Sequence, residues 1–291
     1  MNAMKIALAA VSLPNRSLED ALAITHQQGY EAICIFGATN MRHSGGLLPG
    51  FFWEELDDEG RKKLKQAVSP FNAGAVHAPF QDLPLVSTNK YVEQEAIRQI
   101  IWSIRAAAEL NLEIVTVHAS SPIRMPKEEV LDHAVRNLRI LGDEAQKLGV
   151  CIGLENVIYP TDPDEYVELL DAIDHPAVGA TLDIGHIMFW LRRDGITRLE
   201  GPTGAAFYNT CLEQMIDRLG KRIIHLHIHD VRLPDIRDHR AVGRGIIDFP
   251  MLIRKLRALD FNGMLEFELE EPDDEQASAE SKHCLEQFLQ S

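Results

Sequence analysis

The chain lacks several signals that mark membrane, secreted and nucleotide-binding proteins. Its 291 residues contain no run of eighteen or more apolar residues, so we expect no transmembrane helix and no membrane partner. The opening segment, MNAMKIALAAVSL, is apolar but carries one lysine and no convincing cleavage site, so we interpret it as a core strand and not as a signal peptide. No G-x-G-x-x-G motif follows it, which disfavours a Rossmann fold.

Paired cysteines and an excess of basic residues are also missing. The cysteines are scattered without paired spacing, which is typical of reduced thiols in a cytoplasmic protein: Cys34, Cys151, Cys211 and Cys284. The chain has 44 acidic residues against 29 basic ones, a formal net charge of −15. Charge of this sign disfavours non-specific binding to nucleic acid or to anionic membranes.

The sequence instead contains strand-like segments that alternate with helix-like segments. We predict strands over residues 5–11, 32–36, 72–77, 114–118, 150–155, 178–183, 223–230 and 264–269. The helices between them are predicted over 17–29, 54–68, 90–110, 127–148, 163–173, 249–259 and from 275. The segment 187–219 is longer than one crossover needs, and we expect two helical pieces around an inserted loop that serves as a lid or a subunit contact at 194–209. This order predicts a single α/β domain over 1–291, a (β/α)8 TIM barrel.

One predicted strand, IIHLHIHD at 223–230, is unusual because histidine occupies every second position. Alternate side chains of a strand share a face, so His225, His227 and His229 are expected to point the same way. Buried imidazoles must be hydrogen-bonded or bound to a metal. The alternative is an edge strand that faces solvent, and it is disfavoured because the intervening residues are apolar.

Polar residues also end the predicted strands. In a TIM barrel the carboxyl ends of all strands meet on one face, so six successive strands deliver imidazoles and carboxylates to one place. Such nitrogen and oxygen ligands suit a divalent metal. The residues are His77, His118, Glu155, Asn156, Asp183, His186, His227 and Glu268.

Each of these residues has a simpler interpretation when taken alone. His77 could close a turn before Pro79, His118 could be a core histidine, and Asp183 could cap a helix that begins near His186. Their coincidence at one end of six strands favours a shared site.

The last predicted strand offers a choice of three glutamates on one face. Glu266 is expected to lie deeper in the barrel and Glu270 beyond its rim, so Glu268 is the predicted site residue.

The motifs VHAPF, VTVHAS, GLEN, TLDIGH, HLHIHD, HRAVGRGIIDF and LEFELE resemble the sugar phosphate isomerase/epimerase family of xylose isomerase-like TIM barrels. That superfamily is shared with the endonuclease IV-type AP endonucleases of DNA repair. The resemblance covers nearly the whole chain, and it is specific for the superfamily but not for the substrate.

The resemblance to the epimerases implies that Glu155, Asp183, His227 and Glu268 hold one divalent metal ion per chain, Mn, Zn, Co or Mg. Glu155 and Glu268 would act as base and acid, while the metal stabilises the enediolate charge of a sugar-like substrate. The resemblance implies substrate contacts for His77, His118, His186 and His239.

The resemblance to the nucleases implies a three-zinc site that uses most of the same residues, but the chain departs from it at Arg237. The nuclease pattern has an aspartate two positions before the histidine that matches His239, and Asp238 is one place off. Arg244 replaces a common acidic residue between two glycines. A guanidinium cannot ligate a cation, so a third metal is not expected.

Four functions remain open from the sequence. They are an isomerase or epimerase of a small sugar, phosphorylated or not; a metal-dependent dehydratase of a keto-inositol; an AP endonuclease; and a non-catalytic sugar-binding barrel. Arginines after the histidine strand could recognise a phosphate or carboxylate, or could belong to a solvated loop: Arg232, Arg237, Arg240 and Arg244. Homo-oligomers are common in the resembled family, although no stretch of this chain indicates one.

Overall fold

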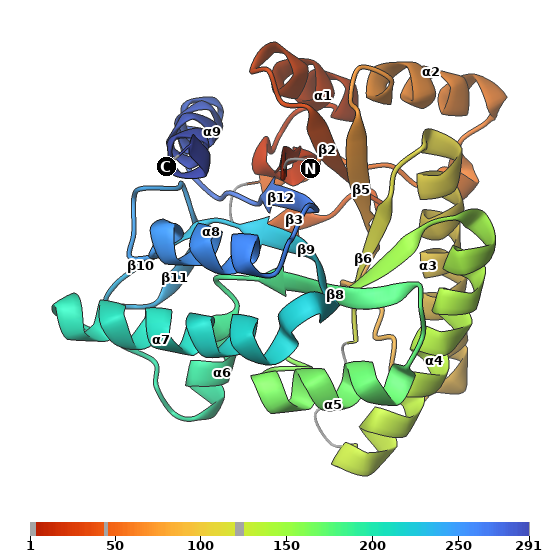
Figure 1. Ribbon diagram of the computed structural model, residues 1–291. Helices are drawn as coiled ribbons and strands as arrows, with labels where there is room; N and C mark the ends of the chain where they lie inside the picture. Colours follow the sequence, from red (N-terminus) through yellow and green to blue (C-terminus); the bar gives the residue numbers. More distant parts are fainter. Residues whose placement is uncertain (1–3, 44–45, 120–124, 291) are drawn as a thin grey trace.

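The computed structural model describes residues 4–43, 46–119 and 125–290. Within them, eight parallel strands close into a barrel in the order β1-β12-β9-β8-β7-β6-β5-β2, with helices around it (Figure 1). The predicted TIM barrel is therefore confirmed. The barrel strands are β1 (Lys5–Ala9), β2 (Ala32–Phe36), β5 (Ala73–His77), β6 (Ile114–His118), β7 (Cys151–Glu155), β8 (Val178–Asp183), β9 (Ile223–Ile228) and β12 (Met264–Phe267).

The helices follow the predicted order, and side chains at their ends explain where they begin. Ser17 accepts a hydrogen bond from the backbone of Asp20, and Asp162 accepts from Asp164 and Glu165, as the capping signals predict. The α-helices are α1 (Leu18–Gln27), α2 (Asp58–Val68), α3 (Lys90–Leu110), α4 (Lys127–Leu148), α5 (Pro163–Ile173), α6 (Ile187–Arg193), α7 (Gly201–Leu219), α8 (Phe249–Ala258) and α9 (Asp274–Gln290).

Some boundaries differ from the prediction by a few residues. Helix α2 begins at Asp58 and not near Glu54, because Asp57 caps it and a short 3-10 helix, Trp53–Glu55, precedes it. Strands β9 and β12 are shorter than expected, so His229 and Glu268 directly follow their strands and do not lie within them. These two side chains therefore lie at the mouth of the barrel.

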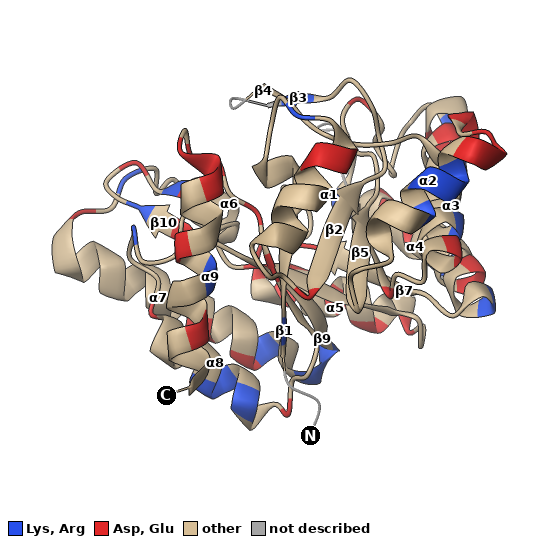
Figure 2. Ribbon diagram, turned by 90° about the horizontal axis from the view of Figure 1, so that it is seen from above, with Lys and Arg blue, Asp and Glu red and all other residues tan. Residues whose placement is uncertain are grey.

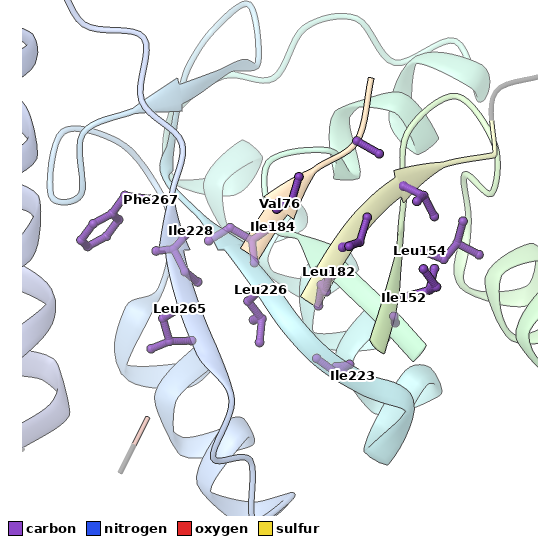
Figure 3. Packing of buried hydrophobic residues seen from close by; sticks show 14 of the residues in the cluster. Val76, Ile152, Leu154, Leu182, Ile184, Ile223, Leu226, Ile228, Leu265 and Phe267 are labelled. Carbon is purple, nitrogen blue, oxygen red and sulfur yellow. The ribbon is translucent and has the colours of Figure 1, made fainter. Parts of the chain in front are cut away.

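The histidine strand β9 is an interior strand, paired on both sides with β8 and β12. His225, His227 and His229 are fully buried. The intervening Leu226 and Ile228 pack in the apolar layer between barrel and helices, as Figure 3 shows. The edge-strand alternative is therefore wrong.

The inside of the barrel has two unlike halves. On β1, β2 and β5 the inward side chains are small, and we call these residues the alanine side: Ala7, Ala9, Ala32, Cys34, Ala73 and Ala75. On β6, β8, β9 and β12 the inward side chains, apart from Ile114 and Met264 at the first position of β6 and β12, are polar and buried, and we call these residues the polar side: Thr116, Thr181, His225, His227 and Glu266. The predicted site residues lie at the carboxyl ends of the barrel strands, most of them next to the polar side and His77 at the end of β5.

Two short antiparallel pairs were not predicted. They are β3 (Arg42–His43) with β4 (Gly46–Leu47), and the ribbon of β10 (Asp230–Arg232) with β11 (Arg237–Arg240). The predicted two helical pieces in 187–219 are confirmed as α6 and α7, but the loop between them spans only 194–200, because residues 201–209, predicted as loop, belong to α7. No helix in the described ranges is long and apolar enough to cross a membrane. Figure 2 shows charges of both signs on α2.

Candidate active site

His227 lies at the centre of the site. Its Nδ1 atom is 3.6 Å from Glu155 Oε1, 3.6 Å from Asp183 Oδ2 and 3.5 Å from Glu268 Oε2. The four side chains come from β7, β8, β9 and the residue after β12. The fold thus brings together the four predicted metal ligands.

The geometry around His227 fits a divalent cation. Two ligand atoms that each lie about 2.1 Å from one ion at a tetrahedral angle are about 3.4 Å apart, close to the spacing seen here. Neither ring nitrogen of His227 has a hydrogen-bond partner, although the side chain is fully buried. An unpaired buried imidazole beside three carboxylates is costly unless positive charge joins them.

Glu155 is enclosed by imidazoles. Its Oε2 atom accepts a hydrogen bond from His118 Nε2 at 2.9 Å and lies 3.3 Å from His77 Nε2, while Oε1 lies 3.0 Å from His186 Nδ1. Burial raises the pKa of Glu155, but the attraction of His227 and His118 outweighs burial and holds that pKa well below its ordinary value. Glu155 is therefore ionised and held in one orientation.

The two oxygens of Asp183 have different partners. Oδ1 accepts hydrogen bonds from the backbone N–H groups of Gly185 and His186, both at 2.8 Å, whereas Oδ2 faces His227. Asp183 thus acts as a cap for the turn before α6 and also reaches the site. Burial raises the pKa of Asp183, but the attraction of His186 and His229 outweighs burial. The pKa of Asp183 therefore lies well below its ordinary value.

Glu268 is the more accessible glutamate, with 12% of its side chain exposed against 1% for Glu155. Its Oε2 atom also lies 3.6 Å from His239 Nε2. Burial raises its pKa, but His227 and His239 outweigh burial and lower the pKa of Glu268 to about 2.

The structure corrects the expectation about Arg237. His239 has a left-handed backbone, φ +55°, and the ribbon has a register shift between Asp230 and Arg232. Arg237 is exposed, while Asp238 Oδ2 lies 3.2 Å from His239 Nδ1 and 3.8 Å from His186 Nε2. Asp238, and not Arg237, therefore places its side chain beside these two histidines, while the expectation that no third metal binds stays a prediction.

Among the described residues, three more groups of possible ligand atoms adjoin the central group of Glu155, Asp183 and His227, and one of them is His225, His227 and Glu266. His77, His118 and Glu155 bring ligand atoms within 4.8 Å of one another, and so do Asp183, His186 and His239. All four histidines predicted to contact substrate therefore border the site. A single metal per chain stays a prediction.

Sequence reasoning missed a buried pair beneath the site, on the polar side. Glu266 Oε2 lies 3.0 Å from His225 Nε2, and Oε1 lies 3.8 Å from His227 Nε2. The other ring nitrogen of His225 lies 3.2 Å from the hydroxyl of Thr181. The signal was present, because His225 and His227, like Glu266 and Glu268, are two residues apart and share a face.

Arginines of the loop after β9 already have acidic partners. Arg240 pairs with Glu271 at 3.1 Å, and Arg244 pairs with Asp273 at 2.8 Å. An anion site in this loop would therefore rest on the exposed Arg232 and Arg237.

A family model described as xylose isomerase-like TIM barrel matches residues 22–288. The chain belongs to this family. Among its relatives, the uncharacterized protein MJ1311 of Methanocaldococcus jannaschii is 29% identical over 226 residues, which cover 74% of this chain and 69% of that protein.

Solved structures of this family have the same fold. A D-tagatose 3-epimerase-like protein is 24% identical with a TM-score of 0.73, and the match covers 99% of this chain and 97% of that one. An IolI protein with a bound zinc atom is 21% identical with a TM-score of 0.69, and the match covers 98% and 96%.

Proposed function

We propose that this protein is a divalent-metal-dependent isomerase or epimerase of a small sugar or sugar-like polyol. The observation that carries the proposal is the set of three carboxylate oxygens around His227 Nδ1, at 3.5 to 3.6 Å. A binding protein would not need two ionised glutamates on either side of one imidazole. The names of fold neighbours, such as L-ribulose 3-epimerase at 15% identity and a TM-score of 0.73, agree with this function.

Glu155, Asp183, His227 and Glu268 would hold the metal, which when bound supplies a positive charge that stabilises negative charge developing on the substrate oxygens. Glu268 would remove the proton next to the carbonyl, because its low pKa keeps it ionised and its side chain is partly exposed. The proton returned to the other face or the neighbouring carbon would pass through Glu155 from the imidazole of His118 or His186, which contact it; that imidazole would regain a proton from solvent, and Glu268 would release its proton to solvent.

The test is proton exchange at the carbon beside the carbonyl. The purified protein, supplied with Mn, Co or Mg, is incubated with a panel of ketoses in D2O, and deuterium uptake and product identity are measured. We expect deuterium in an isomeric product, whereas a product that has lost water would indicate a dehydratase.

The role of Glu268 is tested by Glu268→Gln. We expect a loss of about 10²- to 10⁴-fold in turnover, the usual contribution of a general acid or base, with sugar binding retained. Glu270→Gln, two residues further along, is the matched control and should keep its activity. Full activity in Glu268→Gln would contradict the assignment.

A second function, cleavage of DNA at abasic sites, is favoured by one observation. Asp238 lies beside His239 and His186, so the chain offers a carboxylate where the nuclease pattern needs one. The net charge of −15 opposes binding to DNA. Metal counting separates the two: one ion per chain supports the isomerase, and three zinc ions with cleavage of abasic DNA support the nuclease.

A further inference from the structure

His229 is a buried histidine beside the site that the proposed chemistry does not use. It directly follows β9, is fully buried, and belongs to none of the possible ligand groups in the described ranges. Its Nε2 atom lies 3.0 Å from Asp183 Oδ1 and 3.1 Å from Asp183 Oδ2. Its Nδ1 atom lies 2.9 Å from the backbone nitrogen of His239.

The second of these contacts fixes the proton on His229. Nδ1 lies 2.9 Å from the backbone nitrogen of His239 and 3.4 Å from the backbone oxygen of Asp230, and in the shorter contact the N–H group donates and Nδ1 accepts. The ring then has its proton on Nε2, from which it donates to Asp183.

These hydrogen bonds decide which oxygen of Asp183 remains available. Oδ1 already accepts from the N–H groups of Gly185 and His186, and His229 Nε2 lies within hydrogen-bond distance of both oxygens. The Oδ2 atom is left to face His227 Nδ1 at 3.6 Å. We propose that His229 is a positioning residue, which holds Asp183 in its ligand orientation and links it to the β10–β11 ribbon through His239.

Packing leaves the His229 ring no room to turn. A Cβ atom at Gly185 would lie 1.9 Å from His229 Cε1, so only glycine permits this approach. On another side the ring stacks on His239, with 4.3 Å between centroids and an interplanar angle of 13°. Asp183 and His239 come from distant parts of the chain, and this single ring contacts both.

The inference rests on the metal-binding part of the proposed function, so the test reads metal binding directly. Co²⁺ titrations with visible spectra compare wild type, His229→Phe and His229→Gln. Phenylalanine keeps the ring and its stacking but removes the donor, and we expect affinity to fall about 10- to 100-fold, as when other partners of metal ligands are removed. The Co²⁺ spectrum should also change, because Asp183 is free to reorient. Glutamine can still donate to Asp183 and should restore most of the affinity.

A second measurement needs no variant. Nitrogen NMR of the ¹⁵N-histidine-labelled protein should show the proton of His229 on Nε2 and an accepting Nδ1. A proton on Nδ1 would overturn the inference, and so would wild-type affinity and spectrum in His229→Phe. If the wild type itself binds no divalent metal, the proposed function fails, whereas the NMR result still decides the orientation of His229.

Discussion

The two halves of the barrel interior differ in chemistry although the same fold builds both. The alanine side, on β1, β2 and β5, has side chains of one or two heavy atoms, while the polar side carries imidazoles, hydroxyls and a glutamate. The two halves adjoin where β1 pairs with β12, with Ala7 beside Glu266, and burial together with the carboxylate of Glu266 raises the pKa of Cys34 well above its ordinary value. Small residues on one side thus leave room for the long polar side chains of the other.

This difference suggests that the two halves of the barrel interior have different functions. His227 belongs to the polar side, and the other proposed ligands, Glu155, Asp183 and Glu268, lie at or just after the ends of β7, β8 and β12. Above the alanine side, Phe36 contacts His77, with 5.6 Å between ring centroids. We infer that the polar side holds the cation, whereas the alanine side only completes the wall of the barrel. Four substitutions or measurements test this difference between the two halves.

The largest effect is expected for His227→Ala. The change removes the one nitrogen that the three carboxylates share, so divalent metal affinity should fall by more than the roughly 100-fold seen for partners outside the ligand set. Metal content and a Co²⁺ titration measure the loss, and thermal unfolding checks the fold. His26→Ala, on the exposed face of α1, is the control. Unchanged metal content would contradict the central place of His227.

Metal binding should also depend strongly on pH. Burial lowers the pKa of His227, but the attraction of Glu268 and Glu155 outweighs burial and raises the pKa well above its ordinary 6.5. The metal-free protein therefore holds a proton that the metal must displace, and affinity should rise about tenfold per pH unit below that raised pKa.

The same shift sets the sign of a stability effect. Charged His227 stabilises the metal-free protein fully below pH 6.5, and this stabilisation is lost as pH rises through the raised pKa. Calorimetry in two buffers of different ionisation enthalpy should detect about one proton released per metal at neutral pH. Binding without proton release would mean that His227 is neutral or is not a ligand.

A smaller effect is expected on the alanine side. Ala73→Leu, near the start of β5, places extra methyl and methylene groups against Ala32 in a closed interior. Overpacking should lower the free energy of unfolding by about 1 to 3 kcal/mol, while metal affinity stays within a few-fold. Chemical denaturation measures the first and Co²⁺ titration the second, with exposed Ala23→Leu as control. A large loss of metal affinity in Ala73→Leu would show that the alanine side also supports metal binding, which would contradict the proposed difference between the two halves.

The smallest effect is expected for Arg237→Ala. The side chain is exposed, so stability should change by no more than about 0.5 kcal/mol and metal affinity should not change. Asp238→Asn is the matched neighbour and should weaken metal binding, because its carboxylate contacts His239. If Arg237→Ala and Asp238→Asn changed metal affinity equally, the β10–β11 ribbon would not favour Asp238 over Arg237 at the site.

The sequence predicts the placement of the site well where strand geometry alone decides it. Period-two alternation puts His225 and His227 on one face, and the common direction of parallel strands puts Glu155 and Asp183 at the same end. Both follow from backbone rules that hold for any side chain.

Prediction fails where one residue adopts an uncommon conformation. The left-handed backbone at His239 turns Asp238 toward the site, and few non-glycine residues adopt such values, so spacing alone suggested Arg237. The contact between His229 and Asp183 was also missed, because it depends on the close approach that Gly185 permits.

Closure of the barrel between β1 and β12 also determines when the site can form. A ribosome makes Glu155 long before Glu268, which directly follows the last barrel strand. The proposed set of four ligands therefore cannot be complete until nearly all of this sequence has been synthesised.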